Sequence, residues 1–234
     1  MRQSLESRSG QPGENPDRRD LLTAIAIFVL AVATFAPTLT AEFLHYDDYW
    51  LVVNNERVMD GLSVDGLVYA FTASDAGYPK PLTLISWMMD ADLSGGEPWS
   101  FHLTNVLLHA AGAAALFFFL RCATGSLWRS ALLAALWAVH PLRVESVAWA
   151  AERKDVLSGL LGFLALWAYV LYTRRNQARF AVAGMLLLTL SLLAKPTLVT
   201  LPALLVLLDI WPLRRTSLLP PETGQPATWR RLGL

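Results

Sequence analysis

Two short polar stretches interrupt an otherwise apolar chain, and both carry residues suited to acid–base or phosphate chemistry. The stretch "HYDDYW", residues 45–50, places the adjacent acids Asp47 and Asp48 among aromatic residues. The stretch "HPLRVESVAWAAERKD", residues 140–155, has seven residues out of sixteen that can carry a charge or share a proton. Charged groups are costly beside apolar, membrane-like segments, so their presence there indicates a functional site.

The tandem aspartates have more than one chemical use. Neighbouring side chains point in different directions, so we expect one carboxylate to react and the other to support it. Beside Tyr46, Tyr49 and Trp50, Asp47 or Asp48 could be a general base for a hydroxyl acceptor or could help to hold a divalent cation. A solvated turn with an aromatic belt is the alternative that the sequence leaves open.

The second stretch begins where a helix must stop. Pro141 breaks the preceding apolar segment and restrains His140 before it. A helical pattern resumes at Leu142, and in that helix Glu145 and Glu152, seven residues apart, are predicted to share a face.

The basic residues of the chain's polar stretches are candidates for binding a phosphate. Arg153 and Lys154 stand together in "ERKD", and an arginine can bind a phosphate through two parallel hydrogen bonds. Lys195 in "AKPTLVTLP" and Lys80 in "YPKPLTL" could also lie beside a lipid phosphate. The alternatives are that these cations anchor the chain at the membrane surface and that Asp155 caps a helix.

The composition excludes several classes of protein. Of the 234 residues, 54% are hydrophobic and the net charge is zero, so no basic surplus points to nucleic acid. The single Cys122 cannot form an internal disulfide and is predicted to be a small buried residue. His102 and His109 lie seven apart without acid or cysteine neighbours, so we expect packed or hydrogen-bonded histidines rather than metal ligands.

The apolar runs predict an all-α membrane protein with about six transmembrane helices. The runs cover about residues 21–40, 101–120, 128–140, 156–173, 180–194 and 197–212. A cleaved signal peptide is the alternative for the first run. Residues 1–20 and 213–234 are predicted to be a disordered tail and a flexible segment, both cytoplasmic. Residues 41–100 form a large first extracytoplasmic loop, with short amphipathic helices such as "PLTLISWMMDADL".

The distribution of charge predicts the orientation in the membrane. With six spans, thirteen of the nineteen basic residues fall on the side of the N-terminus, and thirteen acids fall on the other side. The positive-inside rule therefore places the N-terminus in the cytoplasm. Loop 41–100 and residues 140–155 then face the same extracytoplasmic compartment, where we expect them to form one pocket.

Three stretches carry a resemblance to a known family: residues 140–161, "HPLRVESVAWAAERKDVLSGLL", residues 78–110, which begin "YPKPLTLISWMMDADLSGG", and residues 192–215, "LLAKPTLVTLPALLVLLDIWPLRR". In their order they resemble bacterial relatives of the transmembrane and tetratricopeptide-repeat-containing protein O-mannosyltransferases. This resemblance implies a glycosyltransferase of the GT-C class in a bacterial inner membrane. Its partners would be a polyprenyl-phosphate sugar donor, often carrying mannose, and a protein or other hydroxyl acceptor.

The resemblance also implies roles for individual residues. The acidic motif of the family corresponds to Asp47 and Asp48 as catalytic residues. A second block of the family corresponds to His140, Glu145, Arg153, Lys154 and Asp155. We expect the donor phosphate to bind to four cations: Arg153, Lys154, Lys195 and Lys80. The expected supporting residues are His140, Arg143, Glu145, Glu152 and Asp155. Relatives continue past six spans into tetratricopeptide repeats, so the chain is expected to match the N-terminal portion of such an enzyme. An inactive portion, a membrane scaffold and a lipid or solute transporter are the open alternatives.

Overall fold

The computed structural model describes residues 16–73 and 77–215, which form helices joined by turns, with no strand in these two ranges. This confirms the predicted all-α class. The chain divides into two compact units, Met1–Leu198 and Val199–Leu234, and each is described by itself.

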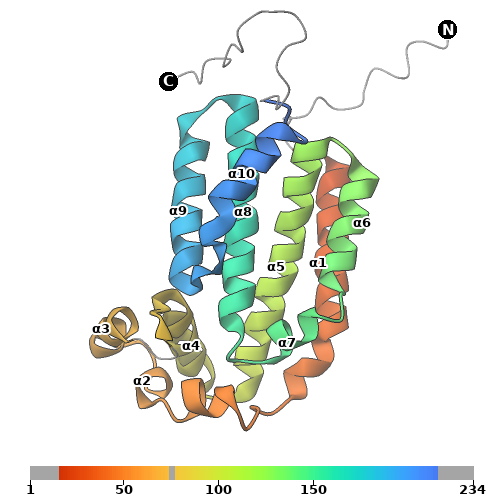
Figure 1. Ribbon diagram of the computed structural model, residues 1–234. Helices are drawn as coiled ribbons and strands as arrows, with labels where there is room; N and C mark the ends of the chain where they lie inside the picture. Colours follow the sequence, from red (N-terminus) through yellow and green to blue (C-terminus); the bar gives the residue numbers. More distant parts are fainter. Residues whose placement is uncertain (1–15, 74–76, 216–234) are drawn as a thin grey trace, which may run out of the picture. The chain divides into compact units, whose positions relative to one another are not determined.

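Five helices run side by side in the first unit (Figure 1). They are α1 (Arg18–Phe35), α5 (Pro98–Thr124), α6 (Leu127–Ala138), α8 (Arg153–Arg175) and α9 (Ala178–Ala194). Helix α5 packs against α1, α6 and α8, and α8 packs against α9. Helices α5 and α8 lie close together at Gly112, where an added Cβ would make an ordinary van der Waals contact, 3.7 Å from the Cα of Leu160.

Three of the described helical segments are long and apolar enough to cross a membrane: Arg18–Thr40, Pro98–Thr124 and Arg153–Arg175. Three further apolar segments, Leu127–Ala138, Ala178–Ala194 and Pro196–Ile210, are shorter. At 1.5 Å per residue, the 12 residues of α6 cover roughly 18 Å, against about 30 Å for a hydrocarbon core. The chain is thus a membrane protein, and the count of six spans stays a prediction.

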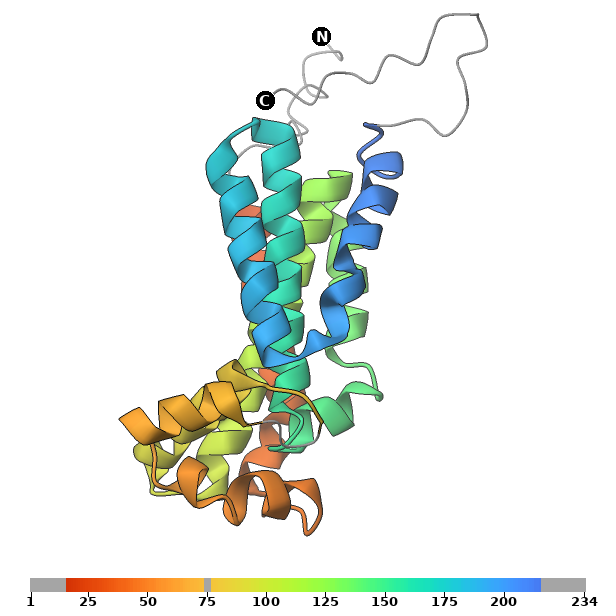
Figure 2. The same ribbon diagram turned by 60° about the vertical axis from the view of Figure 1, so that its left-hand side comes forward.

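Further helices of the first unit gather at one end of these five (Figures 1 and 2). Helices α2 (Glu56–Met59), α3 (Val64–Thr72) and α4 (Pro81–Ser94) follow α1, and α7 (Arg143–Ala148) follows α6. Helices α2, α3 and α4 share a core that includes Leu51, Trp87, Met88, Phe101 and Ala150. Because α1 and α6 end where α5 and α8 begin, residues 41–100 and 140–155 meet at the same end.

The structure corrects two boundaries. Helix α1 begins at Arg18, inside the predicted tail, because Asp17 and Asp20 form a reciprocal cap at its first turn. The helix predicted from Leu142 stops at Ala148, since Trp149 is extended, with φ of −82° and ψ of 128°. Glu145 and Glu152 therefore lie on different elements and share no helix face. The remaining tail predictions, for residues 1–15 and 216–234, lie outside the described residues.

The second unit contains α10 (Leu201–Ile210), which begins after a turn of 3₁₀ helix at Pro196–Thr200. Pro202 falls in the first turn of α10, where a proline costs no helical hydrogen bond. Near its end, the carboxylate of Asp209 pairs with Arg215 at 3.2 Å, so this acid has a cationic partner.

Candidate functional site

Asp48 joins the first loop to the segment that precedes α8. Its side chain is buried, with 1% of the residue exposed. Oδ1 accepts a hydrogen bond from the backbone N–H of Ala151 at 2.7 Å, and Oδ2 accepts one from the N–H of Leu44 at 3.0 Å. A carboxylate held by two N–H groups is a firmly positioned anchor. The structure therefore brings the two polar stretches together through Asp48.

Asp47 is placed differently from its neighbour. It is half-buried, and within residues 16–73 and 77–215 its carboxylate makes no hydrogen bond or ion pair. Aromatic rings surround this part of the loop: His45 stacks on Tyr49 with centroids 4.0 Å apart, and Tyr46 lies 6.0 Å from Trp149. The oxygen atoms of Asp47 are thus available to a ligand, whereas both oxygen atoms of Asp48 accept hydrogen bonds from backbone N–H groups.

Side chains from two other helices hold the break between α7 and α8. Asn105 of α5 donates from Nδ2 to the carbonyls of Val147 and Trp149, at 3.3 and 2.7 Å. Trp87 of α4 donates from Nε1 to the carbonyl of Ala150 at 3.1 Å. A chain that leaves helical geometry inside the protein must find such partners. The break between α7 and α8 is therefore stabilised by specific tertiary hydrogen bonds.

Arg153 is fully buried beneath this segment, with 0% of its surface exposed. Its Nη1 forms an ion pair with Asp90 and donates to the carbonyl of Ser86 at 3.1 Å. Its Nε donates to Oδ1 of Asn105 at 2.8 Å, and Nη2 donates to the carbonyl of Phe101 at 2.7 Å. All three guanidinium nitrogens thus bind groups in the interior of the protein.

The position of Arg153 differs from the expectation that it binds the donor phosphate. Buried arginines are retained where every donor finds a partner, and here those partners are Asp90, Asn105 and backbone carbonyls. Sequence reasoning missed Asp90 and Asn105. The signal was available, since Asp90 is an acid inside the apolar stretch "SWMMDADL".

Two of the predicted phosphate ligands, Lys154 and Lys195, come together in one charge cluster. Nζ of Lys154 lies 2.7 Å from Oε1 of Glu152. Nζ of Lys195 pairs with Asp155 and lies 3.8 Å from Oε2 of Glu152. The side chains of Lys154 and Lys195 are 12% and 24% exposed, so both border solvent. Asp155 pairs with a lysine and does not cap α8, which has no side-chain cap.

The pKa of Lys195 is raised above its ordinary value. Burial alone lowers this pKa, but the hydrogen bond and charge of Asp155, followed by the charge of Glu152, more than offset it. Lys195 therefore carries its positive charge at neutral pH.

Lys80 approaches the same region from α4. It is buried, with Nζ 5.8 Å from the centre of the Tyr78 ring. The hydroxyl of Thr83 donates to the carbonyl of Ala194 at 3.1 Å, which fastens the start of α4 to the end of α9. Lys80 and Lys195 stand at these two joined helix ends, so the predicted cations gather around the start of α8.

The predicted supporting residues on and before α7 lie toward the surface. His140 is exposed, and its Nδ1 accepts a hydrogen bond from the N–H of Leu142 at 3.2 Å. The guanidinium of Arg143 lies 5.3 Å from the centre of the Trp137 ring. Glu145 is exposed, and no described side chain pairs with its carboxylate. These residues border the site without entering the network around Arg153.

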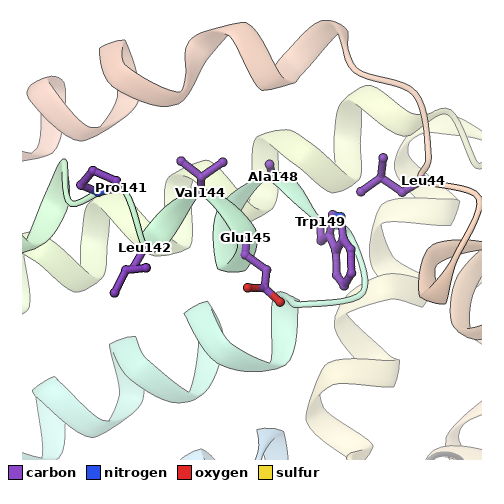
Figure 3. Close-up of a pocket in the computed structure, with 7 residues that line it drawn as sticks. All are labelled: Leu44, Pro141, Leu142, Val144, Glu145, Ala148 and Trp149. Carbon is purple, nitrogen blue, oxygen red and sulfur yellow. The ribbon is translucent and has the colours of Figure 1, made fainter.

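A groove of about 520 Å³ lies beside α7 (Figure 3). Its lining is apolar except for one carboxylate and consists of Leu44, Pro141, Leu142, Val144, Glu145, Ala148 and Trp149. Leu44 is also the residue whose N–H binds Asp48, so the groove adjoins the aspartates.

The histidines of α5 are interior residues. His109 donates from Nε2 to the carbonyl of Ala138 at 2.8 Å and lies between the rings of Phe35 and Trp137. His102 is buried as well, with neither ring nitrogen in a well-formed hydrogen bond to a described residue. Residues 16–73 and 77–215 contain no group of three His, Cys, Asp or Glu side chains that could hold a metal ion.

Fold and site together define an all-α membrane protein that assembles acids and lysines at one end of its helices. Its sequence is similar to proteins named as protein O-mannosyl-transferases. It is 32% identical to TMTC1 of Mus musculus over 68% of the chain and 30% identical to TMTC1 of Homo sapiens over 71%. It is 29% identical to Tmtc2 of Drosophila melanogaster over 77% of the chain.

The chain is therefore a relative of the TMTC protein O-mannosyl-transferases. It spans about a fifth of the length of these proteins, which is 18% for mouse TMTC1 and 21% for the Drosophila protein. No protein-family model matches the sequence. No solved structure matches it either.

Proposed function

We propose that this protein is a membrane glycosyltransferase that moves a sugar from a polyprenyl-phosphate donor to a hydroxyl acceptor on a protein. The sugar that we propose is mannose. The single observation that carries the proposal is the hydrogen bond between Asp48 and the N–H of Ala151. It joins the loop that carries Asp47 to the segment that leads into Glu152 and Lys154. The names of the TMTC relatives support the same chemistry.

In this mechanism Asp47 is the general base. The oxygen of the acceptor hydroxyl attacks the anomeric carbon from the face opposite the phosphate, and Asp47 takes the hydroxyl proton. The bond from the anomeric carbon to the phosphate oxygen breaks, and polyprenyl phosphate leaves with the electron pair. General-base assistance of this kind commonly contributes about 10²- to 10⁴-fold in rate. Asp48 positions the loop that carries Asp47.

Lys154 and Lys195, with Lys80 behind them, bind the donor phosphate and stabilise its charge as it leaves. A single well-placed donor commonly contributes about 3 kcal/mol to such a transition state. In the ligand-free arrangement Glu152 and Asp155 neutralise Lys154 and Lys195. The phosphate therefore competes with these carboxylates for the two lysines. Arg153 acts through the backbone that it fixes, as a positioning residue.

The proposal includes a location for the site. The distribution of basic residues favours a cytoplasmic N-terminus, with the aspartates and lysines on the outer face. The membrane that we propose is a bacterial inner membrane. At the end of the helices a polyprenyl chain can stay in the bilayer while its phosphate reaches lysines at headgroup depth. The headgroup region is where long cationic side chains are favoured.

The test is transfer by the purified protein in membranes. Labelled polyprenyl-phosphate sugars are supplied with peptides that contain serine or threonine, and label on the peptide is measured. Transfer that saturates with the mannose donor supports the proposal. A folded protein that binds no donor and transfers no sugar would contradict it and favour a scaffold. Movement of the labelled donor lipid between leaflets without transfer would favour a transporter.

A further inference from the structure

We infer that the groove beside α7 is the binding site for the acceptor peptide, and that it selects an apolar segment with a lysine or arginine close to the hydroxyl that receives the sugar. This inference rests on the proposed function and adds a specificity to it. The groove is a surface feature distinct from the lysine cluster at the start of α8.

The walls of the groove suit apolar side chains. Val144 and Ala148 point to the same side of α7, and Leu44 faces the ring of Trp149 across its end (Figure 3). A volume of about 520 Å³ lies within the range of sites that bind small ligands or a few side chains. A peptide is therefore held by burial of its apolar side chains against these walls.

The one charge in the groove determines the preferred occupant. Glu145 points away from Val144 and Ala148, and its exposed carboxylate pairs with no described residue. An unpaired carboxylate at the edge of an apolar groove attracts a cation and repels an anion. A phospholipid or the donor phosphate would bring negative charge against Glu145, so a basic peptide fits the groove better than either.

The groove leads to the proposed base. Leu44 lines it and donates its N–H to Asp48, the neighbour of Asp47. Trp149 lines it as well, and its ring lies 6.0 Å from that of Tyr46, which immediately precedes Asp47. A peptide lying along α7 therefore brings a hydroxyl to the loop that carries the aspartates.

The experiment measures binding of peptides apart from sugar transfer. Two fluorescent peptides share an apolar segment and a serine and differ only in a flanking lysine or glutamate. Their affinities for the 234-residue protein in lipid nanodiscs are compared by anisotropy. We expect the lysine peptide to bind about fivefold to tenfold more tightly than the glutamate peptide. The lysine forms a partly exposed ion pair with Glu145, whereas the glutamate is repelled by it. Glu145→Lys should reverse this preference.

A matched control separates local charge from the overall field. Glu97 is exposed at the start of α5 and its side chain makes no cap, so Glu97→Lys should keep the preference for the lysine peptide. Ala148→Trp, which fills the groove, should weaken both peptides about tenfold. Equal affinities of the wild-type protein for the two peptides would overturn the inference. A preference for the lysine peptide that survives Glu145→Lys would also overturn it. The inference would fail as well if Glu145→Lys and Ala148→Trp changed only the partitioning of the peptides into phospholipid vesicles.

The binding assay also keeps this inference separate from the proposed function. Selective peptide binding without sugar transfer would leave the groove established and remove the glycosyltransferase. Sugar transfer at a rate that does not change with the residue at position 145 would support the glycosyltransferase activity. It would contradict the groove as the acceptor site.

Discussion

Asp48 and Lys154 bind opposite ends of the same residue, Ala151. The carboxylate of Asp48 accepts the N–H of Ala151 at 2.7 Å, and Nζ of Lys154 donates to its carbonyl at 3.3 Å. Asp48 lies 103 residues from Ala151 in sequence, so this pairing depends on the whole arrangement of α1, α5 and α8. These two hydrogen bonds attach the loop that carries Asp47 and Asp48, and the side chain of Lys154, to one segment of backbone.

The two aspartates should differ sharply in their effect on stability. In Asp48→Asn the amide keeps one acceptor oxygen but turns an NH₂ group toward a backbone N–H, so one buried hydrogen bond is lost. We expect a loss of about 1–3 kcal/mol in the free energy of unfolding. Asp47→Asn should stay within about 0.5 kcal/mol of the wild-type protein, because Asp47 makes no bond to a described residue. Thermal unfolding in detergent measures both, and equal losses would refute the division of roles.

The ion pair of Arg153 and Asp90 should behave as a unit. Arg153→Met leaves the buried carboxylate of Asp90 without its cation, which typically costs about 3–5 kcal/mol. The double variant Arg153→Met with Asp90→Leu removes both charges and should recover much of that loss. A double-mutant cycle by denaturant unfolding in detergent measures the coupling. Additive losses in the double variant would show that the pair is not coupled.

The raised pKa of Lys195 predicts a loss of stability at high pH. Because its folded-state pKa lies above the unfolded value, its contribution is fully present below the ordinary value of 10.5 and disappears as the pH rises through the folded-state value. Unfolding measured at increasing pH above about 10.5 should show a steeper decline for the wild-type protein than for Lys195→Met. Parallel profiles in that window would show that Asp155 and Glu152 do not hold this charge.

The proposed orientation predicts which end of the helices is accessible from outside. Single cysteines replace Glu97, near the start of α5, or Arg129, near the start of α6, in a Cys122→Ala background. Both positions are exposed and lie at opposite ends of the bundle. In intact cells a membrane-impermeant maleimide should label residue 97 and spare residue 129 until the membrane is opened. The reverse pattern would invert the orientation and place the site in the cytoplasm.

Much of the candidate site could be proposed from residue type because charged groups in apolar surroundings are rare. Asp47, Asp48, Lys154 and Lys195 stood out for that reason, and the alternation of apolar runs placed their loops at one end of the helices. The role of Arg153 could not be predicted, because its partners Asp90 and Asn105 belong to other helices and only tertiary packing reveals them.

The break at Trp149 was missed for a related reason. The local pattern from Leu142 to Asp155 is helical, and nothing in that stretch forbids a continuous helix. Hydrogen bonds donated by Asn105 and Trp87, and one accepted by Asp48, stabilise a non-helical segment there, which local propensity cannot show. Tertiary hydrogen bonds thus override the local preference where the two halves of the site meet.

The most direct test of the proposed chemistry is the rate of sugar transfer by Asp47→Asn. Labelled mannose is followed from polyprenyl-phosphate mannose to a serine peptide, with the unfolding temperature and the binding of the donor measured on the same samples. We predict a fall of at least about 100-fold in kcat with the fold and the donor affinity intact, and partial activity in Asp47→Glu. A folded Asp47→Asn protein that transfers mannose at the wild-type rate would contradict the assignment of Asp47 as the base.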